Sequence, residues 1–222
     1  MTTLAPPATR HLPVEYVWFP ERRHRSEYIA RRFGKELKGR LLDVGCDRAY
    51  LRELLSKERQ DYMGIDIGGT PDIVVNLEQM DRLPFEDNSF DAVVCADVLE
   101  HVDNLHFVFE ELLRVTRGCA VISLPNCWAA ARQPIGRGRG SFCHYGLPAE
   151  RPLDRHKWFF SLTEAMAFYE AQQKKGLFRE MELHATEKPR PAALRALRRI
   201  RYPDELCYLN RYAHTLWAVL KK

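Results

Sequence analysis

The sequence lacks every cysteine pattern that marks a small metal-binding or disulfide-rich domain. Its cysteines include no CxxC pair and have no regular spacing, which argues against a zinc ribbon and a disulfide framework. No apolar run reaches the roughly 18 residues of a membrane-spanning helix, and residues 1–13 lack the apolar stretch of a secretory signal. We therefore expect a cytoplasmic protein without a transmembrane segment, whose thiols are reduced and mostly buried. The six cysteines are Cys46, Cys95, Cys119, Cys127, Cys143 and Cys207.

Strong charge of one sign is also missing, although the net charge of +4 hides an uneven distribution. Residues 1–40 carry +5 and residues 186–222 carry +6, so the centre of the chain carries −7. An acidic centre argues against a core that grips a phosphate backbone, and nucleic acid is therefore an unfavoured principal substrate. The basic flanks could still meet an anionic partner.

What the sequence does contain is enough apolar material for a buried core: 45% of its 222 residues are hydrophobic and 29% are charged. We expect one domain over residues 1–222. Between residues 40 and 125 the hydrophobic pattern alternates between strand and helix, which predicts an α/β fold with a doubly wound, mostly parallel sheet. The expected strands are 40–46, 61–67, 72–77, 91–99 and 118–125, and the expected helices are 49–59 and 103–116.

The alternation stops at Pro125. Glycines, prolines and arginines over residues 126–158 predict a long loop with at most one short helix, which we interpret as a substrate loop or lid. The sequence Ser161-Leu-Thr-Glu164 is a capping box that opens a helix to about residue 175. Strands at 177–186 and 213–220 enclose a basic stretch at 191–201, and residues 1–39 are expected to form an N-terminal arm and a helix.

Several residues suited to binding a nucleoside stand at the ends of the predicted strands. Ligands of open parallel sheets bind beyond the carboxyl ends of the strands. Gly45, after the first strand, lets the backbone approach a ligand, and Asp66, after the second, can accept hydrogen bonds from a ribose diol. Asn76 and the backbone of Leu77 could then contact an adenine edge.

Three segments in this order resemble the class I S-adenosylmethionine-dependent methyltransferases: LLDVGCDRAYL, MGIDI and LPFEDNSFDAVVCADVLEHV. The resemblance covers residues 40–125 and implies a seven-stranded sheet with an antiparallel last strand, matched here by AHTLWAVL. It implies S-adenosylmethionine as the cofactor. Asp47 and Ala49 stand where the family usually has glycines, so a module that binds the cofactor without catalysis is an alternative. The implied cofactor-binding residues are Asp43, Gly45, Cys46, Asp47, Asp66, Ile67, Asn76, Leu77 and Ala96.

A candidate metal site follows the fourth strand. If a helix begins near Asp97, then Glu100 and His101 lie on the same side of it. This spacing resembles the acid-x-x-Glu-His cluster of metal-dependent O-methyltransferases, such as those of ubiquinone biosynthesis and the small-RNA 2′-O-methyltransferases. The segment 154–159 resembles the part of the small-RNA enzymes that supplies a further histidine, here His156. The four residues would suit Mg²⁺ or Mn²⁺. One alternative is that His101 acts as a general base without a metal, and another is that these residues have purely structural roles.

The acceptor is the least constrained part of the interpretation. His144 and Tyr145, in the long loop, are a further polar pair that could reach it, with His144 as a catalytic candidate, and the aromatic residues Trp128, Phe142 and Trp158 suit stacking on a ring. We expect methyl transfer to a hydroxyl of a sugar, glycan or other small molecule. A quinone precursor or an RNA end is the alternative acceptor.

Overall fold

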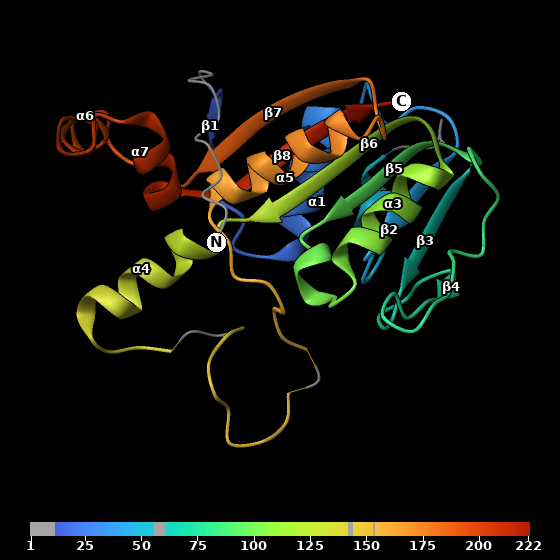
Figure 1. Cartoon of the computed structure of the whole chain (residues 1–222), viewed down its shortest axis with the longest axis horizontal. Coiled ribbons are helices and arrows are strands. Elements are labelled where there is room, and N and C mark those ends of the chain that lie inside the picture. Colours follow the sequence, from blue (N-terminus) through green and yellow to red (C-terminus); the bar gives the residue numbers. More distant parts are fainter. Residues whose placement is uncertain (1–11, 56–60, 142–143, 153) are drawn as a thin grey trace.

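The computed structural model describes residues 12–55, 61–141, 144–152 and 154–222, which form a twisted sheet covered by helices on both faces (Figure 1). The strand order is β1-β7-β8-β6-β5-β2-β3-β4, and β8 runs antiparallel to both of its neighbours while all other pairs are parallel. The strands are β1 (Val14–Tyr16), β2 (Leu41–Val44), β3 (Tyr62–Asp66), β4 (Ile73–Val74), β5 (Phe90–Ala96), β6 (Thr116–Pro125), β7 (Glu180–Glu187) and β8 (Ala213–Lys221). The predicted fold class and the antiparallel last strand are confirmed.

The sheet has one strand more than the seven expected. The extra strand is β1, in the N-terminal arm, where Val14 pairs with Ala185 and Tyr16 with Glu187. A three-residue strand has no periodicity of its own, so the edge of β7 rather than a local pattern decides that this segment is extended. The remainder of the expected arm, residues 1–11, lies outside the described residues.

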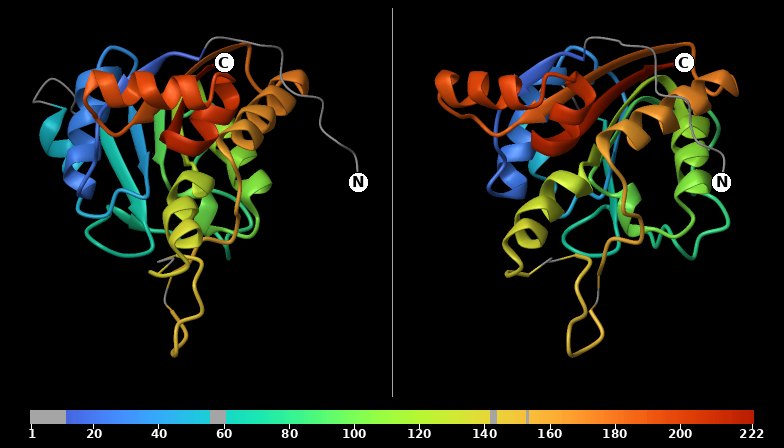
Figure 2. Two further views of the ribbon diagram at one scale, coloured as in Figure 1. Left: turned by 90° about the vertical axis from the view of Figure 1, so that its left-hand side faces the viewer. Right: turned by 60° about the vertical axis from the view of Figure 1, so that its left-hand side comes forward.

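Helices cover both faces of the sheet (Figure 2). On one face α1 and α2 pack over the core around Leu41, and on the other α3 and α5 pack over the core that includes Leu42 and Val44. This alternation follows from the period of two along a strand. The helices are α1 (Arg22–Phe33), α2 (Tyr50–Leu54), α3 (Leu105–Val115), α4 (Cys127–Arg137), α5 (Leu162–Lys174), α6 (Ala192–Arg201) and α7 (Glu205–Tyr212), with a 3₁₀ turn at Leu99–His101.

The segment after Pro125 holds more helix than expected. Helix α4 runs for 11 residues; the Asn126 side chain accepts a hydrogen bond from Ala129 N at its start, and Gly138, with φ of 61°, ends it. Pro134 and Gly136 within the helix make its sequence look like a loop. The Asn126 amide also donates to the carbonyls of Leu209, Asn210 and Ala213, so the start of α4 is held against the end of α7. The described residues after α4 extend away from the sheet (Figures 1 and 2).

Other expectations for the C-terminal half are confirmed. Helix α5 begins with the predicted capping box: Ser161 Oγ accepts from Glu164 N at 3.2 Å, and Glu164 Oε2 accepts from Ser161 N at 2.8 Å. The predicted helix at 49–59 is described only in part, as α2, because residues 56–60 lie outside the described residues. Four of the described cysteines are buried and Cys207 is exposed, while Cys143 is not among the described residues. Within the described part of the chain, no helix is long and apolar enough to cross a membrane.

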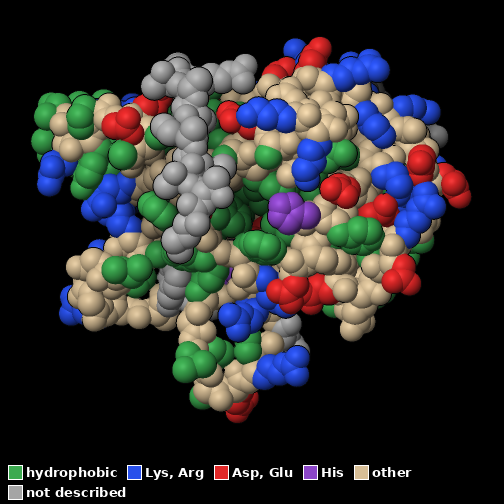
Figure 3. All heavy atoms as spheres, in the orientation of Figure 1, with side chains coloured by type: hydrophobic (Ala, Val, Ile, Leu, Met, Phe, Trp, Pro, Cys, Tyr) green, Lys and Arg blue, Asp and Glu red, His purple; other side chains and the backbone are tan. Residues whose placement is uncertain are grey.

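Helix α6, the predicted basic stretch, is amphipathic, and its basic rather than its apolar side packs against the protein. Its arginines face the protein, where Arg195 Cζ lies 4.0 Å from the centre of the Tyr16 ring and Arg199 Cζ 3.8 Å from that of Tyr208. Its apolar residues face outward, with Leu197 62% and Ile200 78% exposed. Hydrophobic side chains are accordingly visible at the upper left of Figure 3, where α6 lies in Figure 1. Cation–π contacts rather than apolar burial therefore hold this helix in place.

Candidate functional site

A cavity of about 890 Å³ opens at the carboxyl ends of β2, β3 and β5. Seven of the nine residues that the sequence associated with the cofactor line it: Gly45, Asp47, Asp66, Ile67, Asn76, Leu77 and Ala96. The other two do not line it. Asp43 is buried and accepts a 2.5 Å hydrogen bond from the Tyr62 hydroxyl, and Cys46 packs against Gly64. Burial raises the pKa of Asp43 to about 6.

The turn after β2 has the backbone of a glycine-rich loop although it contains few glycines. Gly45 has φ of 76°, and a Cβ there would lie 2.3 Å from Val98 Cγ2, so only glycine fits. Asp47 and Ala49 also have positive φ, 51° and 53°, which non-glycine residues seldom adopt. Asp66 supports this turn from the next strand, because its Oδ2 accepts a hydrogen bond from Asp47 N at 2.8 Å. The two departures from the family's glycine pattern therefore preserve the shape of the turn at a cost in backbone strain.

The expectation that a helix begins at Asp97 is wrong. Asp97 has φ of 52°, and the next helical residues form only the 3₁₀ turn Leu99–His101. The Asp97 carboxylate accepts hydrogen bonds from Arg25 Nη1 at 2.6 Å and from Ser123 Oγ at 2.5 Å. Asp97 thus lies at the rim of the cavity with its own partners, and it is not one of the residues that cluster around Glu100.

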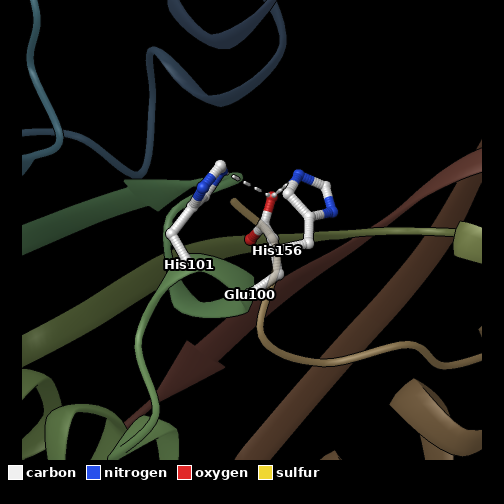
Figure 4. A group of neighbouring side chains, drawn as sticks. All are labelled: Glu100, His101 and His156. Atoms are coloured by element: carbon white, nitrogen blue, oxygen red, sulfur yellow. Dashed lines mark ion pairs between the residues drawn. The ribbon is translucent and has the colours of Figure 1, made fainter. Parts of the chain in front are cut away.

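Glu100, His101 and His156 do come together, as Figure 4 shows. Glu100 Oε1 lies 3.6 Å from His101 Nε2 and 3.9 Å from His156 Nε2. Glu100 is only 1% exposed, and its Oε2 is buried without a hydrogen-bond partner among the described residues. Burial, reinforced by the Asp97 carboxylate, raises the pKa of Glu100 well above its usual range. A carboxyl group in this setting requires either a proton or a cation.

Neighbouring groups orient both imidazoles toward Glu100. His101 Nδ1 lies 2.7 Å from Asp154 Oδ1, and His156 Nδ1 lies 2.9 Å from the Tyr145 hydroxyl. If each Nδ1 donates to that oxygen, each Nε2 keeps a lone pair directed at the cluster, which is the arrangement of histidines that bind metals. Burial and the nearby His101 and His144 lower the pKa of His156 to about 4, so its ring is neutral at pH 7. Sequence reasoning missed the role of Asp154, although it is the first residue of the segment 154–159 that supplied His156.

His144 lies beside this cluster rather than within it. Its ring stacks on that of His156, with centroids 4.5 Å apart and an angle of 12° between the planes. The His144 carbonyl also accepts a hydrogen bond from His156 N at 3.1 Å. The segment after α4 is thereby attached to the irregular segment before α5 that carries His156. Phe142, another residue considered from the sequence, lies outside the described residues.

A second cavity, of about 630 Å³, also borders the histidines. His144 and His156 line this second cavity, whereas His101 lines the first. The second cavity lies between α4, α7, the end of β7 and the start of β8. The histidine cluster therefore borders both cavities, through His101 the one beside the Gly45 turn and through His156 the one beside α4.

Comparison with known proteins defines the class of this fold. Residues 42–122 match the family model described as a methyltransferase domain. A structure of an S-adenosylmethionine-dependent methyltransferase from Archaeoglobus fulgidus has a TM-score of 0.54 and 21% identity, covering 90% of this chain and 94% of that one. The methyltransferase domain of bacterial CtHen1-CN has a TM-score of 0.53 and 17% identity, covering 89% of this chain and 97% of that one. The match over residues 42–122 and these structural likenesses together show that the chain has the class I S-adenosylmethionine-dependent methyltransferase fold.

The particular relatives found among curated proteins are ubiquinone biosynthesis O-methyltransferases. The one from Aliivibrio fischeri (strain MJ11) is 32% identical over 107 residues, which are 42% of this chain and 41% of the relative. The one from Yersinia enterocolitica serotype O:8 is 28% identical over 116 residues, 46% of this chain and 45% of the relative. This chain therefore spans less than half the length of these relatives.

Proposed function

We propose that this protein transfers the methyl group of S-adenosylmethionine to a hydroxyl group of a small molecule, with a divalent ion bound by Glu100, His101 and His156. The observation that carries the proposal is that this cluster borders both cavities, with His101 lining the first and His156 the second. One cavity fits the cofactor and the other is available to the acceptor. An in-line displacement places the methyl group directly between the attacking oxygen and the departing sulfur, and groups that border both cavities can hold that oxygen and take up its proton.

The first cavity has the features that the cofactor requires. Asp66 ends β3, where its carboxylate can accept from a ribose diol, and Gly45 leaves room for close approach of the ligand. Asn76 and Leu77, which follow β4, line the part of the cavity where we propose that the adenine edge is contacted. Arg22 and Arg25 of α1 close the rim above Asp47 and Asp97.

The donor set of the cluster fits a cation such as Mg²⁺ or Mn²⁺. Within the described structure Glu100 has one buried oxygen without a hydrogen-bond partner, and two imidazoles present nitrogens to its other oxygen. A bound divalent ion would lower the pKa of an acceptor hydroxyl and fix its orientation. A vicinal diol suits such a site, and we therefore propose a sugar or glycan as the acceptor. The names of the curated relatives favour a quinone precursor with neighbouring oxygens as the second candidate.

The test compares Glu100→Gln with Glu110→Gln, the same chemical change at an exposed position of α3. Transfer of a radiolabelled methyl group is measured over a panel of sugars, catechols and RNA 3′ ends. Binding of Mn²⁺ and of S-adenosylhomocysteine is measured separately. We expect Glu100→Gln to abolish Mn²⁺ binding and methyl transfer while S-adenosylhomocysteine affinity stays within about threefold of wild type.

Two outcomes would contradict parts of this proposal. Full activity after exhaustive chelation would exclude a catalytic ion and leave His101 as the candidate general base. Cofactor binding without transfer to any acceptor of the panel would favour a binding module over an enzyme.

A further inference from the structure

The second cavity carries a concentration of positive charge that the methyl-transfer step does not explain. Of the described residues that line it, five are cations and one is an acid, Glu187. The cations are Arg132, Lys188, Arg190, Arg198 and Arg211. They come from α4, α6, α7 and the segment after β7, so the tertiary fold rather than a run of basic sequence gathers them.

The acid neutralises at most one of these cations. Glu187 is buried, its carboxylate accepts hydrogen bonds from the Tyr208 hydroxyl at 2.9 and 3.1 Å, and Arg198 Nη1 lies 3.4 Å from it. Among the described residues, no carboxylate lies within ion-pair distance of the other four cations. Burial, together with Arg211 and Arg198, lowers the pKa of Arg132. An anion bound in the cavity would relieve this repulsion.

Two of the guanidinium groups are held in place before any ligand arrives. Arg132 Nε donates a 3.1 Å hydrogen bond to the Arg211 carbonyl, and Arg132 Cζ lies 5.0 Å from the centre of the Tyr212 ring. Arg198 Cζ lies 4.3 Å from the same ring. The Nε of Arg211 is buried and lacks a hydrogen-bond partner in the described structure. Fixed, planar donors of this kind suit the oxygens of a phosphate or carboxylate group.

The cavity also includes His144, Tyr145 and His156, so a ligand held by the arginines would reach the histidine cluster. We propose that the second cavity binds the phosphate or carboxylate group of the methyl acceptor, which is therefore an acidic small molecule such as a sugar phosphate or a uronic acid. This inference rests on the proposed function, because it assigns the same cavity to the acceptor. It adds that a charged group, not only the reacting hydroxyl, selects the substrate.

The experiment measures binding without methyl transfer. Calorimetric titrations with inorganic phosphate, a hexose 6-phosphate, a hexuronate and a neutral hexose are made on the full chain in a phosphate-free buffer of low ionic strength. The variants are Arg190→Gln and the double variant Arg132→Gln/Arg190→Gln. The control is Arg179→Gln, an exposed arginine that does not line the cavity. Affinity for S-adenosylhomocysteine reports whether each variant is folded with an intact cofactor cavity.

We expect the double variant to weaken binding of the acidic probes by about tenfold or more, and Arg190→Gln alone to weaken it by about threefold. Arg179→Gln should stay within about twofold of wild type, as should S-adenosylhomocysteine affinity in every variant. Preference for the hexose phosphate or for the hexuronate identifies which acid the site selects. Either preference, with the neutral hexose binding much more weakly, supports the proposal.

Three results would overturn the proposal. Wild type could fail to bind any acidic probe, the control could lose as much affinity as the cavity variants, or an RNA oligonucleotide could bind where none of the small acids does. Failure of methyl transfer alone is a separate result. Binding that depends on Arg132 and Arg190 without any methylated product would contradict the proposed function and leave the anion site established.

Discussion

Arg25 Nη1 lies 2.6 Å from Asp97 Oδ2, an ion pair between residues 72 positions apart in the chain. Arg25 belongs to α1, Asp97 directly follows β5, and both line the first cavity. The side chains are 21% and 20% exposed, so water screens the pair less than it would at the surface. The pair attaches α1 to the rim of the cavity and gives the Asp97 carboxylate a cationic partner.

The Arg25–Asp97 pair should help to keep the cofactor cavity closed. Arg25→Met should lower the affinity for S-adenosylhomocysteine by about five- to tenfold, because the side of the cavity formed by α1 loses its charge-assisted hydrogen bond. Arg23→Met is the control, since Arg23 lies on the same helix but outside the cavity lining. Equal affinities of the two variants, measured by calorimetry, would contradict a role for the pair in cofactor binding.

Asp66 should be the strongest side-chain determinant of cofactor affinity. Asp66→Ala removes the proposed acceptor for the ribose diol and leaves Asp47 N without its partner, a loss of about 1–3 kcal/mol or roughly 5- to 150-fold in Kd. Asp61→Ala, which removes an exposed carboxylate just before β3, should leave the Kd unchanged. An unchanged Kd for S-adenosylhomocysteine in Asp66→Ala would show that this cavity does not bind the cofactor as proposed.

The left-handed backbone conformation of Ala49 should lower the free energy of unfolding of the protein. Its φ is 53°, so Ala49→Gly removes a steric strain and should raise the free energy of unfolding by about 1 kcal/mol. The same substitution in a regular helix has the opposite sign: Ala131→Gly in α4 should lower it by about 1 kcal/mol. Urea denaturation of both variants tests this difference, and destabilisation by Ala49→Gly would refute the strain argument.

The buried His184 should make stability depend on pH. Its Nε2 lies 2.7 Å from the Tyr28 hydroxyl, which donates to Glu15 Oε2 at 3.0 Å. Burial lowers the pKa of His184 to about 4, whereas the unfolded chain has the ordinary value of about 6.5. Between these values the unfolded state binds more protons, so the free energy of unfolding falls as the pH drops from 6.5 to 4.

The contribution of His184 to this loss should approach about 3 kcal/mol when complete. His184→Phe keeps a ring against Trp217 and removes the titrating group, so the variant should lose less stability over the same pH interval than wild type. His24→Phe, at an exposed position of α1, should retain the wild-type slope. Parallel pH profiles for His184→Phe and wild type would contradict the assignment.

Local sequence pattern was enough to predict the first cavity. Gly45, Asp66 and Asn76 lie at or just after the carboxyl ends of their strands, and the carboxyl ends of parallel strands must lie at one edge of the sheet. The same logic placed Glu100 and His101 together. It misplaced Asp97, because one residue with positive φ prevents the helix that the i, i+3 and i+4 spacing assumed. The length of helix α4 was underestimated because Pro134 and Gly136 are residues typical of loops. Contacts of Asn126 with α7 hold the start of this helix in place.

The sequence by itself determined the alternation of strands and helices, the capping box of α5 and the chemistry at each strand end, because these depend on neighbours a few residues away. Only the tertiary structure decided which distant groups meet. It placed Asp154 beside His101, joined Arg25 to Asp97, and assembled arginines from α4, α6 and α7 around one cavity. Such contacts depend on how helices pack on the sheet, and packing is set by the whole core rather than by the spacing of residues along the chain.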